Sequence, residues 1–193
     1  MKIFYSASAK LRNTIQGEPE QEMVVKPGKE RLAEKYLSQA GHCLVTTGMN
    51  TQSGILTALY SEEPALGVAF CPIVTETKAQ AKAFAVWLNS VFGWLPLMKM
   101  RSGGTMTFPN WSHTQLRQVL LPNPNQCNLD VLIEAFEQVK HEVLLTVTHN
   151  EEDATRKVID RAAAKAAGIP WAKADELRKL LAAEPTIARQ KKT

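Results

Sequence analysis

The chain has 193 residues, 45% of them hydrophobic and 22% charged, which is enough to bury one core with an attached helical segment. Its formal net charge is only +4, so a nucleic-acid partner has to be argued from local clusters of basic residues. No apolar run is long enough for a secretory signal or a bilayer-spanning helix, and Cys43, Cys71 and Cys127 are too widely spaced for a disulfide framework or a zinc knuckle. We therefore expect a cytoplasmic protein with free thiols.

Residues 1–39 are expected to form an N-terminal region with a helix and a flexible loop. Residues 1–16 are compatible with a short helix. Residues 17–30, GEPEQEMVVKPGKE, combine proline, glycine and charge with few apolar side chains, which favours a mobile connection. The run that follows, RLAEKYLSQAGH, is typical of a helix.

Residues 40–150 are expected to form the folded core. Three β-rich runs open it, CLVTTGMN, GILTALY and ALGVAFCPIV, and they are separated by Gly, Asn, Ser and Pro. Together with the helices that follow, these runs predict an α+β fold in which a small mixed β-sheet packs with helices.

A buried helix is predicted over residues 76–93. Thr75 can cap its start and Gly93 can end it. Trp94 follows directly and is expected to join the core. The apolar side chains that recur at helical spacing are Phe84, Trp87, Leu88, Val91 and Phe92.

Two further helices are predicted in this core. SHTQ at residues 112–115 has the form of a capping box and begins a short helix that Pro122 halts. The second helix lies within residues 128–145. Its apolar side is expected to consist of Leu132, Phe136, Val139 and Val143.

Residues 151–193 are expected to form a C-terminal helical segment with a basic tail. The pattern predicts two short helices broken at Gly168-Ile169-Pro170. Arg189, Lys191 and Lys192 make the tail basic.

The stretch between the buried helix and the capping box gathers basic and hydrogen-bonding side chains around two glycines. Glycine lets the main chain approach a phosphate closely, cations bind phosphate, and Arg or Asn can read a base edge. We therefore expect double-stranded DNA as the ligand, although a solvated hairpin around the Ser-Gly-Gly turn accounts for the stretch equally well. The residues expected to bind DNA are Lys99, Arg101, Ser102, Gly103, Gly104, Thr105, Thr107, Asn110, Trp111 and His113.

Catalytic patterns are missing from the sequence. The four histidines, His42, His113, His141 and His149, show no metal-binding spacing, and no nucleophile elbow occurs. Neither a phosphate-binding P-loop nor a dinucleotide-binding glycine turn is found. We expect no catalytic residue, no metal site and no cofactor, and therefore no enzyme activity of the chain alone.

Three segments in order resemble the C-terminal target-recognition region of adenine-specific DNA methyltransferases of restriction-modification systems. They are ALGVAFCPI, then KAFAVWLNSVFGWLPLMKMRSGGTMTFPNWSHTQLRQVLLP, then RKVIDRAAAKAAGI with ELRKLLAAEPTI, and the match spans roughly residues 40–187. The positions that carry the resemblance are Leu88-Asn89-Ser90, Phe108-Pro109, Ser112 to Leu116 and Leu121-Pro122.

The resemblance implies a recognition role without the chemistry. The S-adenosylmethionine-binding glycine motif and the Asn/Asp-Pro-Pro-Tyr/Phe catalytic motif of that family do not occur here, so the chain is expected neither to bind that cofactor nor to transfer a methyl group. The resemblance implies a DNA-binding module, with a separate methyltransferase or nuclease subunit as a possible partner. The alternative is a protein-interaction module or specificity subunit that docks onto such a partner without touching DNA. An exposed Trp94 or Trp171 would favour this alternative, because interfaces are enriched in Trp.

Overall fold

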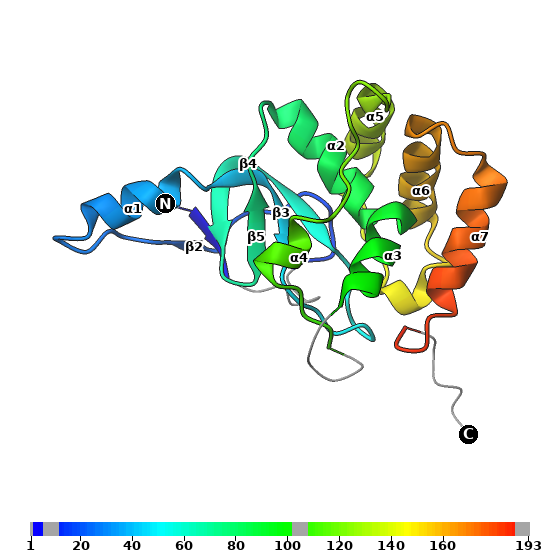
Figure 1. Ribbon diagram of the computed structural model, residues 1–193, viewed down its shortest axis with the longest axis horizontal. Coiled ribbons are helices and arrows are strands. Elements are labelled where there is room, and N and C mark those ends of the chain that lie inside the picture. The colour runs from blue at the N-terminus through cyan, green and yellow to red at the C-terminus, as the bar shows by residue number, and fades with distance from the viewer. Residues whose placement is uncertain (1, 6–11, 102–107, 188–193) are drawn as a thin grey trace.

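The structure is a computed structural model that describes residues 2–5, 12–101 and 108–187 (Figure 1). Within these residues, five strands form one mixed sheet in the order β2-β1-β4-β3-β5. β4 runs parallel to β1 and antiparallel to β3, while β2 and β5 pair antiparallel at the two edges. The strands are β1 (Lys2–Phe4), β2 (Gln21–Glu22), β3 (Gly41–Thr46), β4 (Ala58–Gly67) and β5 (Phe70–Ile73).

Seven α-helices accompany the sheet in the described part of the chain, which confirms the predicted α+β fold. α2 packs against β3 and β4 on one side and against α5 and α6 on the other, and α7 lies outermost (Figure 1). A short 3-10 helix, η1 (Val147–His149), precedes α6. The α-helices are α1 (Glu30–Leu37), α2 (Lys78–Asn89), α3 (Val91–Met100), α4 (His113–Leu116), α5 (Leu129–Val139), α6 (Ala154–Ala166) and α7 (Trp171–Ala182).

The main hydrophobic core lies between the sheet and the helices. It reaches from Ile15 near the N-terminus to Ile187 after α7, and both side chains are fully buried. Burial of each large apolar side chain contributes about 1.5–3 kcal/mol. The three-part division of the chain stays a prediction, although residues of all three parts share this core.

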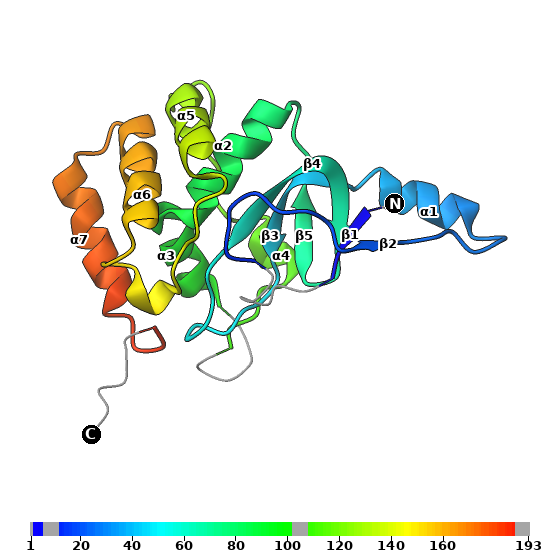
Figure 2. The same cartoon turned by 180° about the vertical axis from the view of Figure 1, so that it is seen from behind.

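The N-terminal region differs from the prediction. Lys2–Phe4 form strand β1, so the short helix expected over residues 1–16 is wrong there, because Phe4 is buried against Phe70 on the sheet. Residues 17–30 include β2, and their mobility stays a prediction. The helix expected next is confirmed as α1, which has no buried residue and projects from the body (Figure 1 and Figure 2).

The three predicted β-rich runs overlap β3, β4 and β5, but their boundaries differ. β3 already begins at Gly41, and β4 continues from Ala58 through the break that was predicted at residues 61–64. The last run divides, since Leu66 and Gly67 pair with β1 and therefore belong to β4. A side chain at Gly67 would collide with Phe70, so glycine permits the tight return from β4 into β5.

The predicted helix over residues 76–93 consists of two helices that meet at Ser90. Thr77, not Thr75, caps α2, because its hydroxyl accepts a hydrogen bond from Gln80 N at 3.1 Å. Ser90 caps α3 by accepting from Phe92 N at 3.2 Å. Gly93 therefore lies inside α3 and ends no helix, and a side chain there would collide with the backbone of Leu88.

The prediction of core residues around this junction is confirmed only in part. Leu88 and Trp94 are fully buried. Trp87 and Phe92 are half-buried and stack on one another, with ring centroids 5.4 Å apart. Asn89 links the end of α2 to the sheet: its Oδ1 accepts from Thr57 N at 3.0 Å and its Nδ2 donates to Ala58 O at 2.6 Å.

The later helices follow the prediction except at two ends. α4 ends at Leu116, well before Pro122, so Pro122 is not the residue that halts it. The capping box at Ser112 is confirmed, and so is the break between α6 and α7, where Gly168 has φ +65°. α5 ends at Val139, and Val143 is exposed rather than buried, so its predicted place on the apolar side is wrong. After α5 the chain turns, and Leu144 enters the core instead, where its N donates to Asn13 O at 2.8 Å.

Candidate nucleic-acid interface

The two segments that flank residues 102–107 are tied to one another and to the body of the protein. Trp111 donates from its main-chain N to Thr47 O at 2.9 Å and from Nε1 to Leu97 O in α3 at 2.6 Å. Gln115, in the capping box of α4, donates from Nε2 to Met100 O at the end of α3. The positions of the two flanks are therefore fixed relative to each other.

The turn after β3 supports the second flank. Gly48 forms an antiparallel bridge with Asn110, and Met49 N donates to Pro109 O at 3.3 Å. A Cβ at Gly48 would collide with Asn110 Oδ1, so a larger residue there would displace the Asn110 side chain. The bridge holds the main chain of Asn110 beside the turn, and its side chain is exposed.

The structure separates the ten predicted DNA-binding residues into three groups. Lys99, Asn110 and His113 are exposed, and Arg101 is 39% exposed in an ion pair. Trp111 is only 3% exposed. Ser102, Gly103, Gly104, Thr105 and Thr107 lie outside the described residues.

Trp111 has little surface to offer to a ligand. Its ring belongs to the main core and its indole N–H is used by Leu97 O. The structure thus makes Trp111 an anchor of the flank, as its position just before the Ser112 cap allows.

Arg101 is paired with a carboxylate from the far end of the chain. Its Nη1 lies 2.8 Å from Glu184 Oε1 and donates to Met98 O at 3.1 Å. The other carboxylate oxygen of Glu184 accepts from Thr186 N at 2.7 Å and from the Thr186 hydroxyl. Thr186 O in turn accepts from Thr51 Oγ1 at 2.7 Å, in the turn region that also supports Asn110.

Two signals that the motif search missed strengthen the basic character of this surface. Residues 77–129 contain five Lys or Arg residues and no Asp or Glu, although Lys78 and Lys82 in α2 are paired with Glu62 and Glu137. Arg117 is one of the five, is exposed, and stands one helical turn after His113. Counting acidic and basic residues along the chain would have found both the acid-free stretch and Arg117. No local sequence pattern predicts the contact of Glu184 with Arg101.

A cavity of about 410 Å³ lies next to His113, between β5 and the α4 region. Its wall is mainly apolar, with Ile73 and Leu116 among its residues, and its polar lining includes Arg117 and Gln39. Burial raises the pKa of the Cys71 thiol in this wall, while Arg117 opposes the shift, so the thiol is not activated as a nucleophile. The cavity holds no convergent set of catalytic groups.

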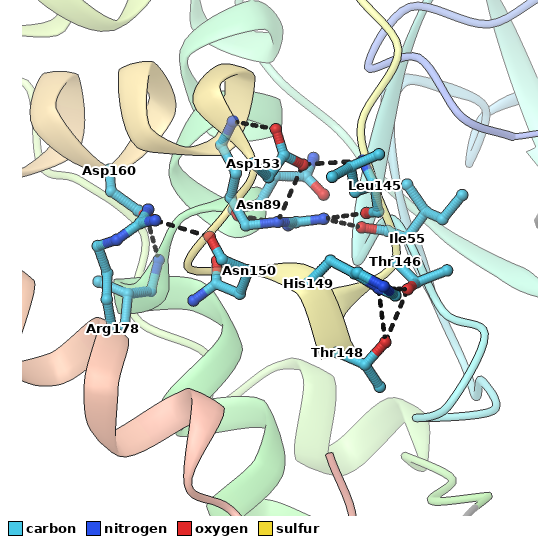
Figure 3. A network of polar contacts seen from close by, with 12 residues as sticks. Ile55, Asn89, Leu145, Thr146, Thr148, His149, Asn150, Asp153, Asp160 and Arg178 are labelled. Carbon is cyan, nitrogen blue, oxygen red and sulfur yellow. Dashed lines mark hydrogen bonds and ion pairs between the residues drawn. The ribbon is translucent and has the colours of Figure 1, made fainter. Parts of the chain in front are cut away.

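A second cluster of polar residues joins α6 and α7 to the core (Figure 3). Arg156, fully buried, donates from Nη2 to the carbonyls of Ile55 and Leu145 at 2.9 and 3.0 Å. Asp160 accepts from Val91 N at 2.6 Å and pairs with Arg178. Because these charges are 3% exposed or less and most of their partners are backbone groups, the cluster fits a structural clamp rather than a reactive site.

Neither metal sites nor known relatives add to this picture. Among the described residues, no group of His, Cys, Asp or Glu is placed to hold a metal ion, and no helix there has the length and apolarity to cross a bilayer. No protein-family model, curated protein or solved structure matches the chain. The function must therefore be argued from the site itself.

Proposed function

We propose that the protein is a DNA-binding module that contacts duplex DNA with the surface around residues 99–117, without catalytic activity of its own. One observation carries the proposal: exposed basic and amide side chains stand on firmly anchored flanks within an acid-free stretch of the chain. Lys99 and Arg117 would contact phosphates, while Asn110 and His113 are of the types that hydrogen-bond to base edges.

The resemblance to target-recognition regions of adenine-specific DNA methyltransferases supports this proposal, because the positions that carry it lie on both sides of the basic stretch and include His113. We propose further that a separate methyltransferase or nuclease subunit supplies any chemistry. A cytoplasmic location fits the three free cysteines, because such thiols persist in reducing compartments.

The second candidate is a protein-interaction module. Trp94 is fully buried and Trp171 packs under Arg161, with 5.0 Å from the guanidinium to the ring centroid, so neither supports a tryptophan-centred interface. One observation does favour this candidate: α1 exposes Leu32 and Leu37 at 48% and 50%. Apolar side chains gathered on a projecting helix are typical of contact surfaces.

A salt series of fluorescence-anisotropy titrations with a duplex pool tests the first candidate. The slope of log K against log salt is negative, and loss of one phosphate contact makes it shallower by about 0.9. Lys99→Ala should therefore weaken binding to all sequences and reduce the steepness of the slope by that amount. Lys173→Ala is the matched control, because it also removes one exposed Lys. Lys173 lies near the start of α7, at the opposite end of this helix from Glu184, the partner of Arg101.

Two results would count against DNA binding. The first is absence of binding at low salt, where phosphate contacts are strongest. The second is a folded Lys99→Ala, Arg101→Ala double variant that keeps both affinity and salt slope. Either result would move the protein-interaction candidate to first place.

A further inference from the structure

The guanidinium of Arg101 is held by one corner, and this leaves one edge open. Nη1 carries two hydrogens and has two acceptors, Glu184 Oε1 at 2.8 Å and Met98 O at 3.1 Å. Among the described residues, no hydrogen-bond or ion-pair partner is found for Nε or Nη2 of Arg101. The Arg101 side chain as a whole is 39% exposed, so a ligand can reach it.

The carboxylate that holds Arg101 is itself held in place. Glu184 Oε2 accepts from Thr186 N at 2.7 Å, and Glu184 is 13% exposed. Thr186 O accepts from both Thr51 Oγ1 and Gln52 Nε2. The support therefore reaches the turn after β3, which also holds Asn110, and Arg101 and Asn110 stand on one framework.

The charge of the pair decides which acceptor suits the open edge. Arg101 and Glu184 together are neutral, so the pair offers a phosphate little net attraction, and the nearby carboxylate repels a second anion. A base edge is neutral and suffers no such repulsion. Guanine presents O6 and N7 side by side in the major groove, and they match two parallel N–H donors of arginine.

We propose that Arg101 reads a guanine through its Nε–Nη2 edge and that Glu184 is the residue that positions it. The inference rests on the proposed DNA-binding function and adds a specificity determinant to it. Lys99 and Arg101 then have different tasks: Lys99 attracts phosphate by its charge, and Arg101 selects a base by the geometry of its hydrogen bonds.

The test measures sequence preference and salt dependence separately. The full-length protein is allowed to select from a random duplex pool at fixed salt, and the bound fraction is sequenced. Salt slopes are then measured on the best sequence and on the same sequence with the preferred guanine replaced. The variants are Arg101→Lys, Glu184→Gln, the double variant Arg101→Ala, Glu184→Gln and, as the control, Lys173→Ala.

Arg101→Lys keeps the positive charge but loses the fork, so preference for one guanine should fall by about 5- to 150-fold while the salt slope stays unchanged. Glu184→Gln keeps an acceptor for Thr186 but removes the opposing charge. We expect this variant to bind all sequences more tightly and to discriminate less at the same guanine. Its salt slope should become steeper by about 0.9.

Three outcomes are distinguishable. Absence of binding by the wild type at low salt would remove the proposed function together with the inference. Binding that shows no guanine position sensitive to Arg101→Lys would overturn the inference alone. In the double variant Arg101→Ala, Glu184→Gln, whose two positions stay neutral overall, a slope shallower by about 0.9 with an unchanged guanine preference would assign the open edge to a phosphate and also overturn it.

Discussion

Replacing Arg156 with methionine tests whether the buried polar network holds α6 and α7 on the core. Methionine has a similar reach but no donor, so the carbonyls of Ile55 and Leu145 lose the guanidinium that now lies at 2.9 and 3.0 Å. Each buried acceptor left without a partner costs about 1–3 kcal/mol. Asp153 still accepts from Leu145 N at 2.8 Å and from the backbone N of residue 156 at 3.0 Å, so its carboxylate is not left unpaired.

Removal of a desolvated guanidinium offsets part of this loss, since burial already lowers the pKa of Arg156 by disfavouring its charge. We expect the free energy of unfolding to fall by about 2–5 kcal/mol, because two buried carbonyls lose their donor and the relief of desolvation offsets only part of that cost. This is a large share of the roughly 5–15 kcal/mol that a domain has in total.

Urea unfolding followed by circular dichroism measures the effect. With a slope of about 2 kcal/mol per molar urea, the midpoint should fall by about 2 M. Lys157→Met is the control on the exposed side of α6 and should change stability by no more than about 0.5 kcal/mol. A loss below about 1 kcal/mol in Arg156→Met, at an unchanged slope, would refute the clamp, because the carbonyls would then have found other donors.

Two more predictions follow from burial. The pKa of the Cys43 thiol is raised by burial to about 12, so at pH 8 iodoacetamide should label Cys43 only after unfolding, as mass spectrometry can show, and rapid labelling of the folded protein would contradict the packing. Trp111→Phe keeps a ring but loses the hydrogen bond to Leu97 O, so it should cost about 1–2 kcal/mol in urea unfolding and weaken DNA binding without changing the salt slope. A changed slope would mean that the substitution had disturbed a cation as well.

The helices that the sequence predicted well are those whose apolar positions repeat locally. α5, α6 and α7 were found because 3.6-residue periodicity and a glycine-proline break are properties of neighbouring residues. The break at Ser90 was missed because the apolar periodicity continues across it, although Ser90 is itself a capping residue. The second acceptor at this break, Asp160, comes from α6 and leaves no local pattern.

The strand at the N-terminus escaped for a similar reason. Lys2–Phe4 are too few to show alternation, and their strand exists because Ile3 pairs with Gln21 on one side and with Leu66 on the other. Val143 was misplaced because its spacing continues that of α5, although the helix ends at Val139. Tertiary pairing decided both outcomes.

The candidate site was located from composition, but the tasks of its residues were not. Sequence proximity grouped Lys99 and Arg101 as equivalent phosphate contacts. The structure pairs only Arg101 with Glu184, which comes from the other end of the chain and is fixed there by Thr186. The carboxylate of Glu184 brings the net charge available to phosphate at Arg101 close to zero, while the hydrogen-bonding capacity of Arg101 is kept. A cation beside a carboxylate is suited to choosing an acceptor by its geometry, and a cation without one is suited to attracting any phosphate.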